Sequence, residues 1–282
     1  MTEVSQEIRA ELKPVLSYLL EERGFDFSGY QPAMLERQVE QRLKAVNCYD
    51  FSAYYFYLTR NTGEIDKLLD VITINVSRFF RDTLTFELLA DRILPAIVRD
   101  KIKRGHPSLR VWSAACARGE EPFSMAILIH ELLHKENQPI HQHIFATDID
   151  EKSLKEAEKA LYPPASIKNM KYRLLNKYFL PEGDCFRLIP EIRESVSFSP
   201  YDMLDRKHRV PPESIFGDFD LVLCRNLLIY FNFEYQELIL KKLYHALADR
   251  GYLVLGTAET LPMAYKPDFN RVFEFSPIFQ KR

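Results

Sequence analysis

The sequence lacks the long apolar runs and the charge excess that mark several classes of protein. No apolar stretch in its 282 residues approaches the roughly 18 residues of a membrane-spanning helix. Its 38 basic and 40 acidic residues give a net charge of -2, so no overall positive field attracts nucleic acid. The first residues, MTEVSQEIRAELKP, are charged throughout, which excludes a secretory signal peptide. We therefore expect a cytoplasmic protein that neither inserts into a membrane nor binds nucleic acid.

Paired cysteines, internal repeats and low-complexity tracts are also missing. Cys48, Cys116, Cys185 and Cys224 are far apart and form no C-x-x-C pair, which argues against a disulfide framework or a zinc site. We expect reduced thiols. Apolar residues make up 46% of the chain, enough for a real core, and the length suits two domains.

The first part of the chain has the periodicity of helices. Apolar residues recur at helical spacing over 4–22 and 30–46, and shorter amphipathic stretches cover 51–58 and 65–71. Nothing in this part resembles a strand. The pattern predicts an all-helical domain over residues 1–72.

Strands alternate with helices in the rest of the chain. Short apolar segments at 109–113, 143–148, 219–224 and 251–256 are typical of strands in a parallel sheet. Helical patterns cover 84–102, 120–134, 235–248 and a stretch ending at residue 160. The alternation predicts a doubly wound α/β domain over 73–282. It breaks within about 163–200, where strand-like runs at 185–189 and 195–198 suggest a small antiparallel β subdomain.

Ligands of such sheets bind beyond the carboxyl ends of the strands, and the first of these ends carries small residues and two acids. The loop after residue 113 has one glycine, Gly119, so the glycine pattern of a diphosphate site is absent. Glu120 and Glu121 would repel phosphate but suit a cationic ligand. The alternative is that both acids only complement the helix dipole.

Two further strand ends carry polar residues. Asp148 ends the second strand, where an acid commonly accepts hydrogen bonds from a ribose, while Asp150 is better placed to cap the next helix. A capping role for Asp148 remains the alternative. Arg225 and Asn226 follow a buried strand and need partners there. The rings of Tyr230 and Phe231 could face a sulfonium cation, as aromatic rings attract other cations. The alternative, favoured for Phe231, is an ordinary aromatic core.

One motif points elsewhere. His130 to His134 read H-E-x-x-H, the pattern of zinc proteases, and His141 and His143 lie nearby in the sequence. The motif falls in the last turn of its predicted helix, away from the strand carboxyl ends, where histidines suit the helix dipole. We therefore expect no metal site, and a zinc protease is the disfavoured alternative.

Taken together, several segments resemble the chemotaxis receptor methyltransferases, the CheR family. They are the helix with Tyr30, Arg37, Arg42 and Leu43, the run 73–81 ending in FFR, GEEP (119–122), ATDID (146–150), CRNLLIYF (224–231) and the closing segment 253–259. The resemblance covers nearly the whole chain. It implies a Rossmann-like class I methyltransferase core, a helical N-terminal domain and a small antiparallel β subdomain.

The resemblance also implies an activity. The chain would transfer a methyl group from S-adenosylmethionine to glutamates of methyl-accepting chemotaxis receptors, leaving S-adenosylhomocysteine. We expect it to act as a monomer on the cytoplasmic region of the receptors. Two alternatives stay open: a CheR-like domain that binds either molecule as a regulatory module, and a methyltransferase of a non-receptor protein.

By position, the resemblance implies a role for each of several residues. Arg81 would pair with the methionyl carboxylate or hold the substrate near the methyl group, and Tyr230 would lie beside the transferred methyl. Arg81 and Tyr230 would thereby align the reacting groups. Glu121 would bind the methionyl amine, and Asp148 would bind the ribose. The full set expected around the cofactor is Asn75, Ser77, Arg81, Glu121, Asp148, Asp202, Met203, Arg225 and Asn226. Asp202 and Met203 would flank the adenine.

Two further features concern the protein substrate, and a third is a departure from the family pattern. Arg37, Arg42 and Lys44 would face the receptor, unless they form an ordinary solvated helix face. The short loop within 178–186, with one glycine, favours an enzyme that needs no receptor tether. Arg118 stands where the family usually has threonine and adds a cation near a cationic cofactor.

Overall fold

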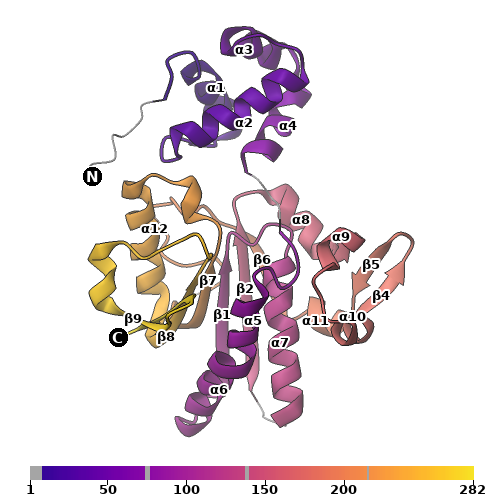
Figure 1. Cartoon of the computed structure of the whole chain (residues 1–282), viewed down its shortest axis with the longest axis vertical. Helices are drawn as coiled ribbons and strands as arrows, with labels where there is room; N and C mark the ends of the chain where they lie inside the picture. Colours follow the sequence, from indigo (N-terminus) through magenta and orange to yellow (C-terminus); the bar gives the residue numbers. More distant parts are fainter. Residues whose placement is uncertain (1–7, 74–76, 137–139, 215) are drawn as a thin grey trace. The chain divides into compact units, whose positions relative to one another are not determined.

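The computed structural model describes residues 8–73, 77–136, 140–214 and 216–282 (Figure 1). The chain divides into two compact units. The helical unit comprises Met1–Asn75 and Ile229–Gln236, and the sheet unit comprises Val76–Leu228 and Glu237–Arg282. Among the described residues, no helix combines the length and the apolar character needed to cross a membrane.

Within residues 8–73 of the helical unit, four α-helices surround an apolar core. They are α1 (Lys13–Arg23), α2 (Pro32–Ala45), α3 (Phe51–Arg60) and α4 (Thr62–Ile72). The side chains that meet in the core include Leu12, Val15, Leu19, Leu35, Val39, Tyr54, Leu58, Ile65 and Leu68. The predicted all-helical character is confirmed.

The start of the first helix is wrong in the prediction. Residues 4–7 of the predicted helix lie outside the described residues, and helix α1 begins only at Lys13. Pro14 explains this start, because proline has no N–H and its fixed φ suits the first turn of a helix.

A short segment from late in the chain completes the helical unit. Residues 228–230 form the 3-10 helix η2 (Leu228–Tyr230), and the following residues run beside the loop before α2. The Tyr230 carbonyl accepts a hydrogen bond from the Gln31 N–H at 2.8 Å, and the Asn232 N–H donates to the Gly29 carbonyl at 2.9 Å. A Cβ on Gly29 would lie 2.5–2.7 Å from the Tyr235 ring, so only glycine fits there.

The sheet unit is built on one seven-stranded sheet with the order β6-β2-β1-β7-β8-β10-β9. Its strands are β1 (Ser108–Ala114), β2 (His141–Asp148), β6 (Val196–Pro200), β7 (Phe219–Cys224), β8 (Leu247–Leu255), β9 (Phe269–Phe273) and β10 (Ser276–Lys281). Strands β1, β2, β6, β7 and β8 run parallel, and β10 is antiparallel to β8. The strand order reverses between β1 and β7, which is where an open sheet of this kind has its ligand crevice.

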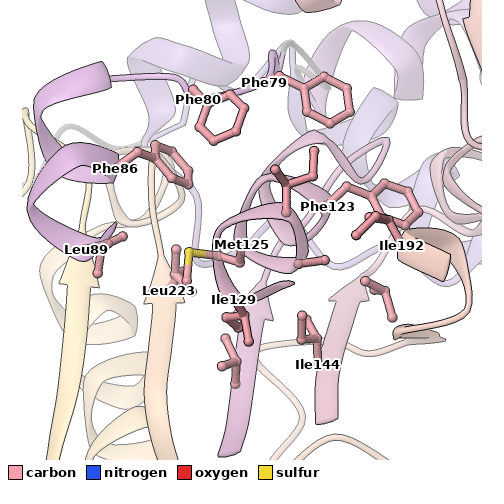
Figure 2. Close-up of a cluster of buried hydrophobic side chains, with 14 of the residues drawn as sticks. Phe79, Phe80, Phe86, Leu89, Phe123, Met125, Ile129, Ile144, Ile192 and Leu223 are labelled. Carbon is pink, nitrogen blue, oxygen red and sulfur yellow. The ribbon is translucent and has the colours of Figure 1, made fainter. Parts of the chain in front are cut away.

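Helices pack on this sheet through a large apolar cluster. The helices that contribute to this cluster include α5 (Thr83–Leu88), the π-helix η1 (Leu89–Ile93), α6 (Leu94–Lys103), α7 (Glu120–Glu136) and α8 (Glu151–Lys159). The sheet unit also contains most of α12 (Phe233–Ala246) and the 3-10 helix η3 (Met263–Asp268) before β9. Figure 2 shows Met125 of α7 lying beside Leu223 of β7, and Phe80 beside Phe86. The predicted single helix 84–102 is interrupted by η1, because Pro95 lacks the N–H for the α-helical bond to Asp91.

A three-stranded antiparallel sheet, in the order β3-β5-β4, forms the small subdomain. It consists of β3 (Leu161–Tyr162), β4 (Phe179–Glu182) and β5 (Cys185–Leu188), with the short helices α9 (Pro164–Ile167), α10 (Tyr172–Tyr178) and α11 (Pro190–Arg193) around it. The predicted antiparallel subdomain is confirmed, but the assignment of 195–198 to it is wrong. That run is strand β6, which pairs in parallel with β2 at the edge of the main sheet. The hairpin β9–β10 was not predicted.

Gly119, in the loop after β1, is closely surrounded by other residues. Its φ is +88°, and an added Cβ would lie 2.9 Å from the Cβ of Ala157. We expect Gly119→Ala to lower the free energy of unfolding by about 2–4 kcal/mol, from backbone strain together with overpacking. Gly105 is the control, because its φ is +68° but no atom lies within 4 Å of an added Cβ. Gly105→Ala should cost about 1 kcal/mol in urea unfolding, and equal losses in the two variants would contradict the packing argument.

Candidate functional site

The carboxyl ends of β1, β2, β6 and β7 lie along one edge of the sheet, and polar residues follow each of them. The loop after β1 is held in an unusual backbone conformation. Ala115, Ala117 and Gly119 have φ values of 60°, 49° and 88°, in the left-handed region. Non-glycine residues hold such a conformation only where the surroundings fix it. Alanine has the Cβ that makes this conformation unfavourable by about 1–2 kcal/mol, so contacts around the loop must offset that cost.

Asp148 at the end of β2 is one of the groups that fix this loop. Its Oδ2 accepts a hydrogen bond from the Ala117 N–H at 2.8 Å, and its Oδ1 accepts one from the Asp150 N–H at 3.0 Å. The side chain is buried, and this burial raises the pKa of Asp148, while the backbone donors oppose the change. Each oxygen of a carboxylate has a second acceptor position, so Asp148 can brace the loop and accept from a hydroxyl group as well.

Asp150 has the predicted capping role. Its side chain accepts from the Lys152 N–H at 3.0 Å and from the Ser153 hydroxyl at 2.8 Å at the start of α8. The two acids of this segment therefore serve different elements.

Arg225, directly after β7, is the centre of a buried ionic cluster. Its guanidinium donates to Glu121 Oε2 at 3.1 Å, to Asp82 Oδ2 at 2.6 Å and to the Arg81 carbonyl at 2.8 Å. Only 1% of the Arg225 side chain is exposed. Glu121 also accepts from the Ser113 hydroxyl at 2.8 Å. Two carboxylates, those of Asp82 and Glu121, share the guanidinium of Arg225, and carboxylates placed in this way favour a cationic ligand.

The segment that carries Arg81 is tied to α7 and α9. The Phe80 N–H donates to Ser124 Oγ at 3.0 Å, and the Phe79 N–H donates to the Ser166 carbonyl at 2.9 Å. Phe80 and Asp82, on either side of Arg81, both have positive φ, at 53° and 61°. These contacts fix the backbone of Arg81, whose side chain is half-buried.

Glu259, to which the sequence pattern assigned no role, is a buried residue that holds the turn after β7. Its carboxylate accepts backbone N–H groups from Asn226 at 2.9 Å, from Leu228 at 2.7 Å and from Gly256. It thereby fixes Asn226 in the left-handed conformation, with φ 60°. A Cβ on Gly256 would lie 2.7 Å from Glu259 Oε2. The sequence feature that could have indicated this role is an acid, Glu259, three residues after Gly256 at the end of a strand.

The remaining predicted cofactor residues have different surroundings. Asn75 lies outside the described residues. Ser77 is hydrogen-bonded through its side chain to Glu120, a buried acid whose pKa is raised by burial. Asp202 and Met203 follow β6: Asp202 is exposed and accepts from the Leu204 N–H at 2.8 Å, and Met203 is buried.

Arg118 points toward an acid of the neighbouring helix. It forms an ion pair with Glu156 of α8 at 3.0 Å, and 52% of its side chain is exposed. Its backbone carbonyl accepts from the Tyr162 hydroxyl at 2.8 Å. Glu156 therefore balances the cation that departs from the family pattern.

The other predicted residues belong to the helical unit. The backbone of Tyr230 is bonded to that of Gln31, as described above, and its side chain packs against the helical core. Arg42 donates to both oxygens of the buried Glu64 at 2.9 Å, so the structure gives it an internal partner in place of the predicted exposed surface. Arg37 and Lys44 are exposed.

In the H-E-x-x-H motif, Glu131 and His130 contact other side chains of the protein. Glu131 forms ion pairs with Arg173 at 2.5 Å and Lys177 at 2.6 Å and accepts from the Tyr178 hydroxyl at 2.6 Å. His130 Nδ1 lies 3.0 Å from that hydroxyl. Within the described ranges, no group of three or more His, Cys, Asp or Glu side chains is arranged to hold a metal ion.

Comparison with known proteins gives two family matches that together cover most of the chain. Residues 10–73 match the all-alpha domain of CheR methyltransferases, and residues 75–275 match the SAM binding domain of CheR methyltransferases.

Three relatives illustrate the similarity. A putative methyltransferase Cher3 of Pseudomonas putida is 30% identical over 280 residues, 96% of each chain. A chemotaxis protein methyltransferase of Salmonella typhimurium is 30% identical over 273 residues, 95% of this chain and 87% of the relative. An uncharacterized 104.1 kDa protein of Rhodobacter capsulatus is 31% identical over 236 residues, which are 84% of this chain but only 24% of that protein.

The Glu131 cluster generates a prediction about pH. Burial acts to raise the pKa of Glu131, but hydrogen bonds from Lys177, Tyr178 and Arg173 outweigh it and lower the pKa to about 2, from 4.5. The ionised form is therefore stabilised by folding, and this contribution is present above pH 4.5 and lost as the pH falls toward 2. Urea unfolding should show Glu131→Gln to be less stable than the wild type at neutral pH, with the gap closing over this window. Glu158→Gln, at an exposed position of α8, is the control, and a gap that does not depend on pH would contradict the assignment.

Glu259→Gln tests the anchor after β7. The amide nitrogen of glutamine cannot accept from an N–H, so at least one backbone donor loses its partner in a buried site. We expect the free energy of unfolding to fall by about 2–3 kcal/mol. Glu274→Gln, at an exposed position between β9 and β10, should leave it unchanged. A Glu259→Gln protein as stable as this control would show that the carboxylate is not needed.

Proposed function

This chain belongs to the CheR methyltransferase family, and from that membership we propose that it methylates glutamate side chains of chemotaxis receptors. The methyl donor is S-adenosylmethionine, and the product is S-adenosylhomocysteine. Relatives named chemotaxis protein methyltransferases, which this chain matches over most of its length, support receptors as the class of substrate. We further propose that the protein acts in the cytoplasm as a monomer.

The observation that carries the proposal is the set of carboxylates near the strand ends. Asp82 and Glu121 share the guanidinium of Arg225, which follows β7, and Asp148 lies at the end of β2, on the other side of β1. These carboxylates suit a ligand that carries a sulfonium, an ammonium and a ribose. In the proposed arrangement Glu121 binds the methionyl amine and Asp148 the ribose, while Asp202 and Met203 flank the adenine. Asn75, Ser77, Arg225 and Asn226 complete the surroundings.

The reaction requires little acid–base chemistry from the protein. A free glutamate has a pKa of about 4.3, so the attacking carboxylate is already ionised at neutral pH. When bound, S-adenosylmethionine supplies an activated methyl group. The protein's contribution is to align the carboxylate with that group and to remove water from it. We propose that Arg81 and Tyr230 provide this alignment. The fixed backbone of Arg81 suits the task, because an aligning side chain must be held in place.

Arg37 and Lys44 remain the proposed contacts for an acidic receptor segment, because both are exposed on α2. Arg42 would support that helix indirectly. Its bidentate pair with Glu64 joins α2 to α4, and the Tyr54 hydroxyl donates to the same carboxylate at 3.0 Å.

The proposal is tested by base-labile methyl transfer. The purified protein is incubated with radiolabelled S-adenosylmethionine and the cytoplasmic fragment of a chemotaxis receptor, and alkali-released methanol is counted. We expect transfer by the wild type and a loss of about 100-fold in kcat/KM for Arg81→Ala. Arg78→Ala is the matched control, because Arg78 is exposed three residues away.

If no methyl transfer is detected, calorimetric titration with S-adenosylhomocysteine shows whether the protein still binds the reaction product. Binding that Asp148→Ala weakens, without any base-labile transfer to receptor fragments, would favour a regulatory module or another protein substrate. No binding of S-adenosylhomocysteine by the wild type would overturn the proposed function.

A further inference from the structure

Lys242 of α12 is a buried cation whose partners are backbone carbonyls. Only 7% of the residue is exposed. Its ammonium donates to the Asp205 carbonyl at 2.7 Å and approaches the Asp202 carbonyl at 3.4 Å. It also lies 4.7 Å from the centre of the Tyr201 ring. Among the described side chains, no carboxylate forms an ion pair with it.

Burying an ammonium in this way is unfavourable on its own. Loss of hydration lowers the pKa of Lys242 to about 8, although the charges of Asp205 and Asp202 oppose this change. An apolar side chain of similar size would avoid the cost of desolvation. The cation is therefore best explained by what it does to the two carbonyls.

Both carbonyls belong to the segment that follows β6. The Tyr201 N–H donates to the Asp148 carbonyl at 2.9 Å, which holds the start of this segment against β2. The Tyr201 hydroxyl donates to the His208 carbonyl at 2.8 Å. Between these points, the Asp205 N–H donates to the Asp202 carbonyl at 3.0 Å and closes a turn over residues 202–205. Lys242 bonds to the carbonyls at both ends of this turn.

We propose that Lys242 is a positioning residue for recognition of the adenine ring. By holding the carbonyls of Asp202 and Asp205, it sets the conformation in which the turn presents Asp202 and Met203 to the base. The inference rests on the proposed function, which assigns these two residues to the adenine. It concerns selectivity for the base, which a merely structural lysine would not affect.

The test compares two ligands that differ only in the base: S-adenosylhomocysteine and S-inosylhomocysteine. We expect Lys242→Met to raise the Kd for S-adenosylhomocysteine about tenfold, the effect of losing one charged hydrogen bond, and to leave the Kd for S-inosylhomocysteine nearly unchanged. The preference of the wild type for adenine should therefore shrink. Lys242→Arg, which keeps a cationic donor, should restore it. Lys241→Met is the matched control, because Lys241 is the exposed neighbour on the same helix.

The outcomes are distinguishable. A wild type that binds neither ligand overturns the proposed function itself. A wild type that binds, with an unchanged ratio of the two Kd values in Lys242→Met, overturns this inference alone, whether both affinities stay the same or fall together. Thermal unfolding of every variant confirms that it is folded. Lys242→Gln, which is neutral and shorter, provides the same comparison where methionine is not tolerated.

Discussion

The buried guanidinium of Arg225 is the interaction on which the rest of the site depends. It draws together the end of β7, the first turn of α7 and the backbone of Arg81. A cation this deeply buried is tolerated only when acids and carbonyls surround it, and Asp82 and Glu121 fill that requirement. The same arrangement places two carboxylates close to each other. Removing either acid would alter both the packing of the segment and its attraction for a cation.

Two other carboxylates hold the backbone in place near this edge of the sheet. Asp148 holds the loop after β1, and Glu259 holds the turn after β7. Each accepts N–H groups from residues near or in the left-handed region, including Ala117 and Asn226. In many nucleotide-binding loops, glycines provide this conformation. Here alanine and asparagine adopt it because a carboxylate accepts a hydrogen bond from their backbone N–H groups. Few glycines are therefore needed.

Much of this fold could be predicted from the sequence, because its main segments have clear periodicity and end in polar residues. The alternation after residue 80 predicted the parallel sheet, and Asp148 and Arg225 were found as polar residues at strand ends. Errors arose where a tertiary contact decides the outcome. The run 195–198 has the same local pattern in either sheet, and only its pairing with β2 settles its place.

The site was less predictable than the fold for a related reason. Arg42 is an ordinary exposed-looking cation in the sequence, and its partner Glu64 lies 22 residues further on. Glu259 lies 33 residues from Asn226, and no local spacing connects the two. The roles expected of Asp202, Met203 and Tyr230 remain predictions.

The helical unit is discontinuous in the chain, and this affects the order in which it can be completed. Residues 1–75 are synthesised before the segment 229–236, which pairs with Gly29 and Gln31. Until then the backbone groups of that loop and the apolar surface beside Tyr30 lack their native partners. The helical unit therefore reaches its full set of native contacts only after residues 229–236 have been synthesised.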